Sequence, residues 1–159
     1  MTTEKMKELL FRHYSKLGTY QCPEVAIPRE IDNHFHRQRV DWLLYEKKNH
    51  IFRGFELKLT KSDFYSSAAH TFVYDYNYYV MPKSLYSKVK DDIPDFVGVW
   101  TCIDGSNSLF CEKRPKKQKL KCSVEAMQFA MFQALSREVN KSLINKYAIK
   151  TTKKGRIKK

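Results

Sequence analysis

The stretch that decides the fold is R-V-D-W-L-L-Y-E-K-K-N-H-I-F-R-G-F-E-L-K, which runs from Arg39 to Lys58. Two apolar runs within it, Val40–Tyr45 and Ile51–Leu59, predict β-strands. The polar residues Glu46–His50 between them predict a turn. The stretch is therefore expected to form a β-hairpin at the centre of the fold.

Asp41, Glu56 and Lys58 are ionisable residues inside these otherwise apolar runs. Burying a charge in a strand is costly unless the charges pair or hold a metal. Because side chains two apart in a strand point the same way, Glu56 and Lys58 share one face. In a paired hairpin, Asp41 near the start of one strand lies close to Glu56 near the end of the other.

Two carboxylates and an amine at the edge of a sheet suit phosphodiester hydrolysis. Mg²⁺ prefers hard oxygen ligands and binds through one or two carboxylates plus substrate phosphate. We expect Asp41 and Glu56 to hold Mg²⁺, with Mn²⁺ as a substitute and the backbone carbonyl of Leu57 as a further ligand. The metal would lower the pKa of a bound water and offset charge on the phosphodiester. Lys58 would orient that water or stabilise the transition state.

The pattern Asp41…Glu56-Leu57-Lys58 resembles the PD-(D/E)XK nuclease superfamily, with Val40 in place of the proline. The continuation E-L-K-L-T-K-S-D-F, followed by Y-N-Y-Y-V-M-P, looks like small stand-alone nuclease-like proteins of phages and prophages and like the MmcB-type DNA repair proteins. The resemblance covers 39–82, and more loosely continues to Trp100. It implies a restriction-endonuclease-like core. The superfamily also includes members that bind without cutting.

The resemblance suggests further site residues. Some families with this fold place a metal-site glutamate on the first helix, which makes Glu8 a candidate beside the alternative of a solvated surface carboxylate. Glu30 is a second candidate for an auxiliary acidic ligand. Some members carry Q-x-x-x-Y on the helix after the ExK strand, and His70 with Tyr74 could stand in for it to position substrate. The alternative is a surface histidine and a half-buried tyrosine.

Composition points to a polyanionic partner. The chain of 159 residues has 30 Lys and Arg against 17 Asp and Glu, a formal net charge of +13. Such an excess favours nucleic acid or an anionic membrane surface. No apolar run approaches the ~20 residues that span a bilayer, and the N-terminus lacks the apolar region of a signal peptide. Nucleic acid, most simply DNA, is therefore the expected partner, in the cytoplasm of a bacterial or phage-infected cell.

Several basic residues are expected to contact phosphates in a salt-dependent and largely sequence-independent way. Two lie before the first strand of the hairpin, one begins the helix after it, and four belong to the run Lys113–Lys121. They are Arg37, Arg39, Lys61, Arg114, Lys116, Lys117 and Lys119. The polar tail 149–159 is too polar to fold alone.

The four cysteines form no C-x-x-C pair. With no export signal, a disulfide framework is not expected. A zinc site would need closer spacing or histidine partners. Cys102 and Cys111 could meet across a hairpin, but both are interpreted as ordinary small hydrophobic residues.

Periodicity predicts an α/β fold with a mixed central sheet flanked by helices, in a single domain, 1–148. Helices are expected at 3–17, 60–74, 83–92 and 123–147. Strands are expected at 21–27, 75–81, 96–101 and 108–111 besides the hairpin. The passage Ile51–Met81 should pair its two strands in parallel.

The sequence thus predicts a metal-dependent endonuclease that hydrolyses DNA phosphodiesters in phage or bacterial DNA processing, repair or defence. Two alternatives stay open: a nuclease-like fold that binds nucleic acid or a partner protein without cutting, and an RNA endonuclease. Small enzymes of this kind often dimerise to cut both strands, so a homodimer is an expectation for which the sequence shows no interface.

Overall fold

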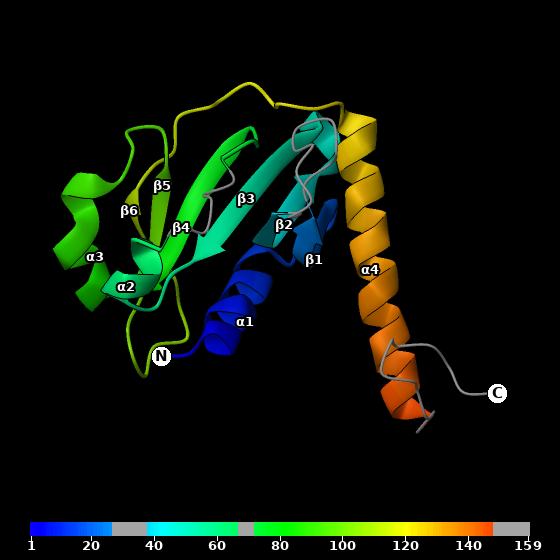
Figure 1. The fold of residues 1–159 in the computed structure, drawn as a ribbon, viewed down its shortest axis with the longest axis horizontal. Helices are drawn as coiled ribbons and strands as arrows, with labels where there is room; N and C mark the ends of the chain where they lie inside the picture. Colours follow the sequence, from blue (N-terminus) through cyan, green and yellow to red (C-terminus); the bar gives the residue numbers. More distant parts are fainter. Residues whose placement is uncertain (27–37, 67–71, 148–159) are drawn as a thin grey trace.

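A six-stranded mixed sheet forms the centre of the computed structural model, which describes residues 1–26, 38–66 and 72–147. Helices α1, α2, α3 and α4 surround the sheet (Figure 1). In chain order the elements are α1 (Thr3–Tyr14), β1 (Thr19–Ala26), β2 (Arg39–Glu46), η1 (Lys47–Asn49), β3 (Ile51–Leu57), α2 (Lys61–Phe64), β4 (Tyr76–Pro82), α3 (Lys83–Val89), η2 (Lys90–Asp92), β5 (Gly98–Cys102), β6 (Phe110–Lys113) and α4 (Val124–Lys146). The α/β class and the mixed sheet are confirmed.

The strands lie in the order β1-β2-β3-β4-β5-β6, the same as their order along the chain. The first three strands form an antiparallel meander. Strands β3, β4 and β5 then run parallel, and β6 returns antiparallel along the edge. The predicted hairpin and the predicted parallel pairing after it are both confirmed.

The two faces of the sheet are covered by different helices. Helix α1 packs on one face against β2, β3 and β4, in a cluster that includes Met6, Leu9, Leu10, Trp42, Leu44, Phe55, Leu57 and Val80. Helix α4 packs on Leu43, Tyr45 and Phe52, and α2 and α3 pack on Tyr79 and Met81. Tyr79 is opposite Glu56 in the β3–β4 pairing. Glu56 lies four residues after Phe52 in β3, so the two side chains point to the same face. The cluster under α4 and the cluster under α2 and α3 therefore share the second face of the sheet.

Local caps begin the helices where the sequence predicts them. The Thr2 hydroxyl accepts a hydrogen bond from the Lys5 N–H over 3.2 Å at the start of α1. The Ser123 hydroxyl accepts from the Ala126 N–H over 3.1 Å at the start of α4. Each cap satisfies a backbone N–H that has no partner within its helix.

The helix predicted for 60–74 is wrong in length: α2 ends at Phe64, and Phe72 to Asp75 are not helical. Other groups hold the backbone at this point. The Asn77 side-chain amide donates to the Tyr74 carbonyl over 3.0 Å and accepts from its N–H over 3.2 Å. The Lys121 N–H donates to the Val73 carbonyl over 3.0 Å. Tertiary contacts far along the chain therefore override the local helical pattern.

All four cysteines are free thiols. Within the described ranges, no helix combines the length and apolarity needed to cross a bilayer.

Candidate functional site

The candidate site lies at the end of β3, where the chain leaves the sheet for α2 (Figure 1). The β2–β3 pairing runs from Glu46 opposite Ile51 to Trp42 opposite Phe55. Asp41 and Glu56 are the residues directly beyond the last pair of this register, Trp42 and Phe55. The hairpin therefore brings to one end of the sheet two carboxylates that are 15 residues apart in the sequence.

Asp41 is half-buried, and its Oδ2 accepts a hydrogen bond from the Leu57 N–H over 2.8 Å. Burial raises the pKa of the Asp41 carboxyl above its usual value, and the Leu57 N–H and the Lys58 charge oppose that rise in part. The Glu24 carboxylate adds to the rise. Asp41 therefore lies in a poorly solvated place, in the field of the charged side chains of Glu24, Lys58 and Lys7.

Leu57 offers a second oxygen on the same side. In an antiparallel ladder the N–H and C=O of one residue point to the same neighbouring strand. Because the Leu57 N–H points to Asp41, the Leu57 carbonyl is directed toward β2 as well. The predicted further ligand thus lies on the side of β3 that faces the Asp41 carboxylate.

Glu56 and Lys58 are almost fully enclosed, with 8 % and 5 % of their surfaces exposed. The Glu56 charge acts on Tyr79, whose pKa is raised mainly by burial and further by this carboxylate. The Lys58 Nζ donates to the Asp63 carbonyl over 3.3 Å and lies 3.7 Å from its carboxylate. Both charges therefore lie on the face covered by α2 and α4.

Asp63 is a further residue of the site that the sequence analysis did not single out. Thr60 Oγ1 accepts from the Asp63 N–H over 3.1 Å, as the T-x-x-D pattern predicts. The Asp63 carboxylate reaches back to the Leu59 N–H over 3.0 Å. Since the same residue holds the Lys58 amine, α2 fixes the position of that amine at the end of β3.

Glu8, the first candidate for an auxiliary ligand, is engaged elsewhere. It lies on α1 and forms ion pairs with Lys5 at 3.0 Å and Arg12 at 2.8 Å. The Lys5 ammonium holds its pKa below the usual value. In this arrangement Glu8 has the surface role that was the alternative interpretation. Glu30, the other candidate, lies outside the described residues.

Tyr74 belongs to the hydrophobic core. Its side chain is 1 % exposed, and its ring packs over Gly54, where an added Cβ would lie 2.0 Å from the ring. The prediction that Tyr74 shares a helical face with His70 is wrong, because Tyr74 is not in a helix. His70 lies outside the described residues.

The chemistry of the donors fits a divalent ion such as Mg²⁺: two carboxylates and a backbone carbonyl, all hard oxygens. Across residues 1–26, 38–66 and 72–147, no three His, Cys, Asp or Glu side chains come together in a way that could hold a metal ion. Any metal here would therefore rely on Asp41, Glu56 and the Leu57 carbonyl, together with water or substrate oxygens.

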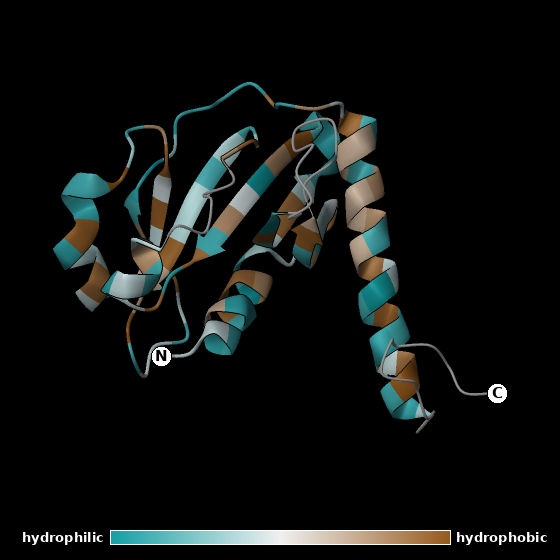
Figure 2. Cartoon of the chain, in the orientation of Figure 1, coloured by the Kyte–Doolittle hydropathy of each residue, from teal (hydrophilic) through white to brown (hydrophobic). Residues whose placement is uncertain are grey.

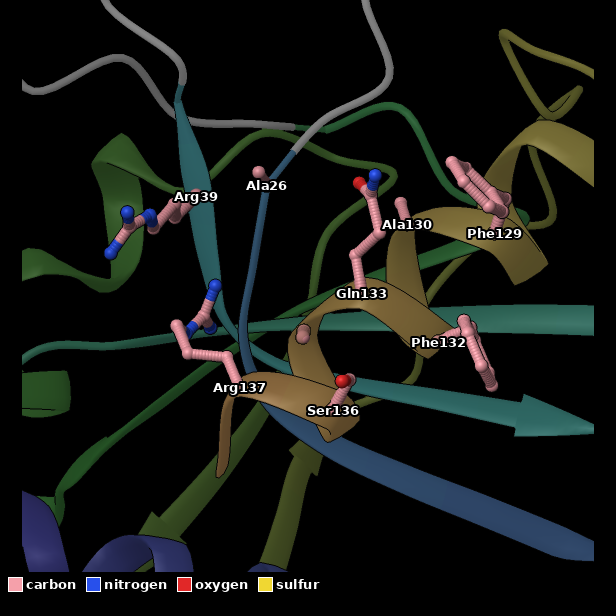
Figure 3. Close-up of a pocket in the computed structure, with 9 residues that line it drawn as sticks. Ala26, Arg39, Phe129, Ala130, Phe132, Gln133, Ser136 and Arg137 are labelled. Carbon is pink, nitrogen blue, oxygen red and sulfur yellow. The ribbon is translucent and has the colours of Figure 1, made fainter. Parts of the chain in front are cut away.

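Arg39 begins β2 two residues before Asp41 and lines a hollow of about 410 Å³ between β1, β2 and α4. Figure 3 shows its guanidinium and that of Arg137, from α4, on the same side of this hollow. Arg137 also donates to the Glu24 carbonyl over 2.7 Å, at a residue with φ of 53°. Sequence reasoning missed Arg137, because a lone arginine on a long helix carries no pattern of its own.

The basic segment 114–119 lies at the opposite end of the parallel strands. It crosses from β6 to α4 (Figure 1). The Gln118 N–H donates to the Asp75 carbonyl over 2.8 Å, and the Asp75 carboxylate in turn accepts from Phe52, at the start of β3. Arg114, Lys116, Lys117 and Lys119 are exposed there. The length of β3 therefore separates these four side chains from the acidic residues at its end.

Lys61 is the remaining residue of the predicted phosphate-binding set within the described ranges. It is exposed at the first position of α2, three residues after Lys58, with its amine 5.7 Å from the centre of the Tyr65 ring. Of that set, Lys61 and Arg39 therefore lie nearest to the end of β3. Arg37 lies outside the described residues.

Comparison with known proteins shows a shared fold and identifies no function. No family model and no curated protein matches the chain. A similar solved structure is that of a protein of unknown function from Silicibacter pomeroyi, with a TM-score of 0.63 at 15 % identity over 91 % of this chain and 90 % of that one. The likeness extends over nearly the whole of both chains, and at this identity it concerns the fold alone.

Proposed function

We propose that this chain is a metal-dependent endonuclease that hydrolyses phosphodiester bonds in DNA. The observation that supports the proposal is that the Asp41 carboxylate accepts the Leu57 N–H and lies in the field of Lys58 at the end of β3, where Glu56 precedes Leu57. Two acids and an amine in a poorly solvated place are costly to keep there. A metal with a phosphate substrate is a chemical reason to keep them.

Asp41, Glu56 and the Leu57 carbonyl would hold Mg²⁺ or Mn²⁺, which when bound supplies a water of lowered pKa and a counter-charge for the phosphate. Lys58, held by Asp63, would orient the attacking water or donate a hydrogen bond to a phosphate oxygen. Arg39 and Lys61 would bind phosphates beside the scissile bond. The basic segment 114–119 would bind the strand about six nucleotides away, since β3 is seven residues long, a strand rises about 3.3 Å per residue and nucleotides are spaced about 3.4 Å along a strand.

The direct test is nicking of supercoiled plasmid with and without Mn²⁺. We expect Glu56→Gln and Lys58→Met each to lower the rate about 100-fold or more. Glu46→Gln is the matched control, because Glu46 is a half-buried acid at the other end of the same hairpin, paired with Arg53. Nicking by the purified chain that survives both site variants would overturn the proposal.

A second candidate is a protein that binds nucleic acid without cutting it. The low exposure of Glu56 and Lys58 favours it, because a catalytic carboxylate and amine must reach substrate. Mn²⁺ titration by calorimetry separates the two candidates. Heat of binding that Asp41→Asn removes supports the enzyme. Salt-sensitive DNA binding with no Mn²⁺ heat and no product supports the binding protein. Parallel assays on RNA address the third alternative, an RNA endonuclease.

A further inference from the structure

Helix α4 has two apolar faces, and the sheet covers one of them. Its buried residues are Met127, Ala130, Met131 and Ala134, all in the half that packs against β1. Six further large apolar side chains are 38 % to 68 % exposed. We call them the α4 stripe: Phe129, Phe132, Leu135, Val139, Leu143 and Tyr147.

The stripe is a continuous line along the helix. Phe132, Leu135, Val139 and Leu143 follow one another at spacings of three or four, which about 3.6 residues per turn places on one side. Beyond Ala134 no residue of α4 is buried. The C-terminal half of α4 extends past the sheet, and Figure 2 shows apolar bands continuing along it. A helix that only covered β1 would need no apolar side chains there.

The exposed area is sufficient for a stable contact. With about 200 Å² for a large side chain, the exposed parts of the stripe come to roughly 600 Å². Two such stripes pressed together would bury about 1,200 Å², the lower bound of specific interfaces. A hollow of about 240 Å³ beside the stripe, between Tyr20, Tyr45 and Leu135, provides room for a partner side chain.

The charges at the ends of the stripe indicate which partner fits. Glu125, Phe132, Val139 and Lys146 follow at intervals of seven, so an acid ends the stripe at its N-terminal side and a base at its C-terminal side. An antiparallel second copy places Glu125 of each chain near Lys146 of the other. It also sets the two helix dipoles antiparallel. A parallel copy would place like charges together.

The net charge of the chain does not oppose pairing of two copies through α4. The chain carries +13 overall, but α4 contributes three basic and two acidic residues, so the excess lies elsewhere. At physiological salt, charges farther apart than about 8 Å are largely screened.

A membrane surface is a poorer partner, because interfacial helices carry a strongly basic polar face, and the polar residues of α4 include Glu138 and Asn140.

We infer that the α4 stripe is a homodimer interface in which two copies of α4 pack antiparallel about a two-fold axis near the middle of the stripe. The inference is independent of the proposed nuclease function. It predicts an isologous contact, in which each protomer contributes the same residues.

Sedimentation equilibrium on the full chain between about 1 and 200 µM tests the interface. We expect a wild-type dimer. Phe132→Glu with Val139→Glu places four acids at the contact and should raise Kd by about thirtyfold or more. The matched control is Ile103→Glu with Phe110→Glu, which adds the same charge at exposed apolar sites beside β5 and β6, at the sheet edge opposite the β1 edge on which α4 packs. A monomeric wild type, or a dimer that the stripe variant leaves intact, would overturn the inference.

Charge reversal tests the antiparallel arrangement. Glu125→Lys and Lys146→Glu alone should each weaken the dimer several-fold, and the double variant should restore it. Failure of the double variant to recover affinity would overturn the antiparallel pairing. Binding of a monomeric wild type to anionic phospholipid vesicles through the stripe would overturn the homodimer in favour of a membrane partner.

Discussion

At the start of β3 the Asp75 carboxylate accepts the Phe52 N–H over 2.8 Å, and at its end the Asp41 carboxylate accepts the Leu57 N–H over the same distance. The two hydrogen bonds are alike, but their surroundings differ. Asp41 lies in the field of Lys58, Glu24 and Lys7, and burial raises its pKa. Asp75 lies beneath the basic segment that joins β6 to α4. The same kind of backbone contact therefore lies among several charged side chains at one end of the strand and beneath a loop backbone at the other.

The largest expected effect is a difference in metal-dependent nicking between variants of these two aspartates. Asp41→Asn and Asp75→Asn both keep a side-chain oxygen that can accept the backbone N–H. Because only Asp41 would hold metal, Asp41→Asn should lower metal-dependent nicking about 100-fold or more, while Asp75→Asn changes it by less than about threefold. Thermal unfolding of both variants gives the control. Equal activity in the two variants would remove the distinction between the ends of β3.

The middle of β3, between the two aspartates, packs closely against the Tyr74 ring. Gly54→Ala would place a Cβ 2.0 Å from the buried Tyr74 ring, and the variant should lose about 3 kcal/mol of unfolding free energy by urea denaturation. In a Tyr74→Leu background the same change should cost less, because the ring that it meets is gone. An equal cost in both backgrounds would show that Tyr74 is not the obstacle.

The basic segment at the start of β3 should contribute affinity without contributing chemistry. Replacing Lys116, Lys117 and Lys119 by Gln should weaken DNA binding about tenfold and lower the slope of log K against log salt by up to about three. Replacing Lys88, Lys90 and Lys141 by Gln removes the same charge from other exposed positions and should change the slope less. An unchanged slope in the first variant would exclude this segment from phosphate contact.

The smallest effect concerns an ion pair at the end of the parallel strands, between Glu112 and Lys83 at 2.5 Å. The Lys83 ammonium, with the Thr101 hydroxyl, holds the pKa of Glu112 below its usual value. A carboxyl with a lowered folded pKa stabilises the protein above its unfolded pKa, and this stabilisation is lost as pH falls through the folded pKa. Because the pair is partly solvated, Glu112→Gln should cost less than about 1 kcal/mol at pH 7.

Urea denaturation from pH 7 to pH 3 measures this cost. The difference between wild type and Glu112→Gln should shrink toward acid pH. Lys83→Met should remove most of the pH dependence as well, since it removes the same pair. A difference that stays constant across the range would assign the cost to packing rather than to charge.

Much of the fold was predictable because its signals are local. The two strands of the hairpin were expected at 40–45 and 51–59 and are found at Arg39–Glu46 and Ile51–Leu57. Alternating apolar residues determine such strands, and a turn of fixed length sets their register. The hydrogen bond from the Leu57 N–H to the Asp41 carboxylate lies at the end of this pairing, so the expected nearness of Asp41 to the end of β3 came from the same local pattern as the strands.

The failures have one physical origin, which is competition from distant contacts. The helical pattern toward Tyr74 gave way to hydrogen bonds from Asn77 and Lys121 and to the packing of the Tyr74 ring on Gly54. The position of the basic segment could not be predicted either, because its backbone is held at the start of β3 by a hydrogen bond to Asp75. Asp63 and Arg137 gained their roles only because α2 and α4 fold back onto the ends of β3 and β1.

By itself the sequence determined the order of the elements, the hairpin register and the basic charge, because periodicity and composition act over short ranges. Tertiary structure decided which charges share an end of the sheet, how deeply Glu56 and Lys58 are enclosed, and that α4 keeps an apolar stripe beyond the sheet. Burial and charge proximity depend on residues far apart in the chain, so no local pattern could specify them.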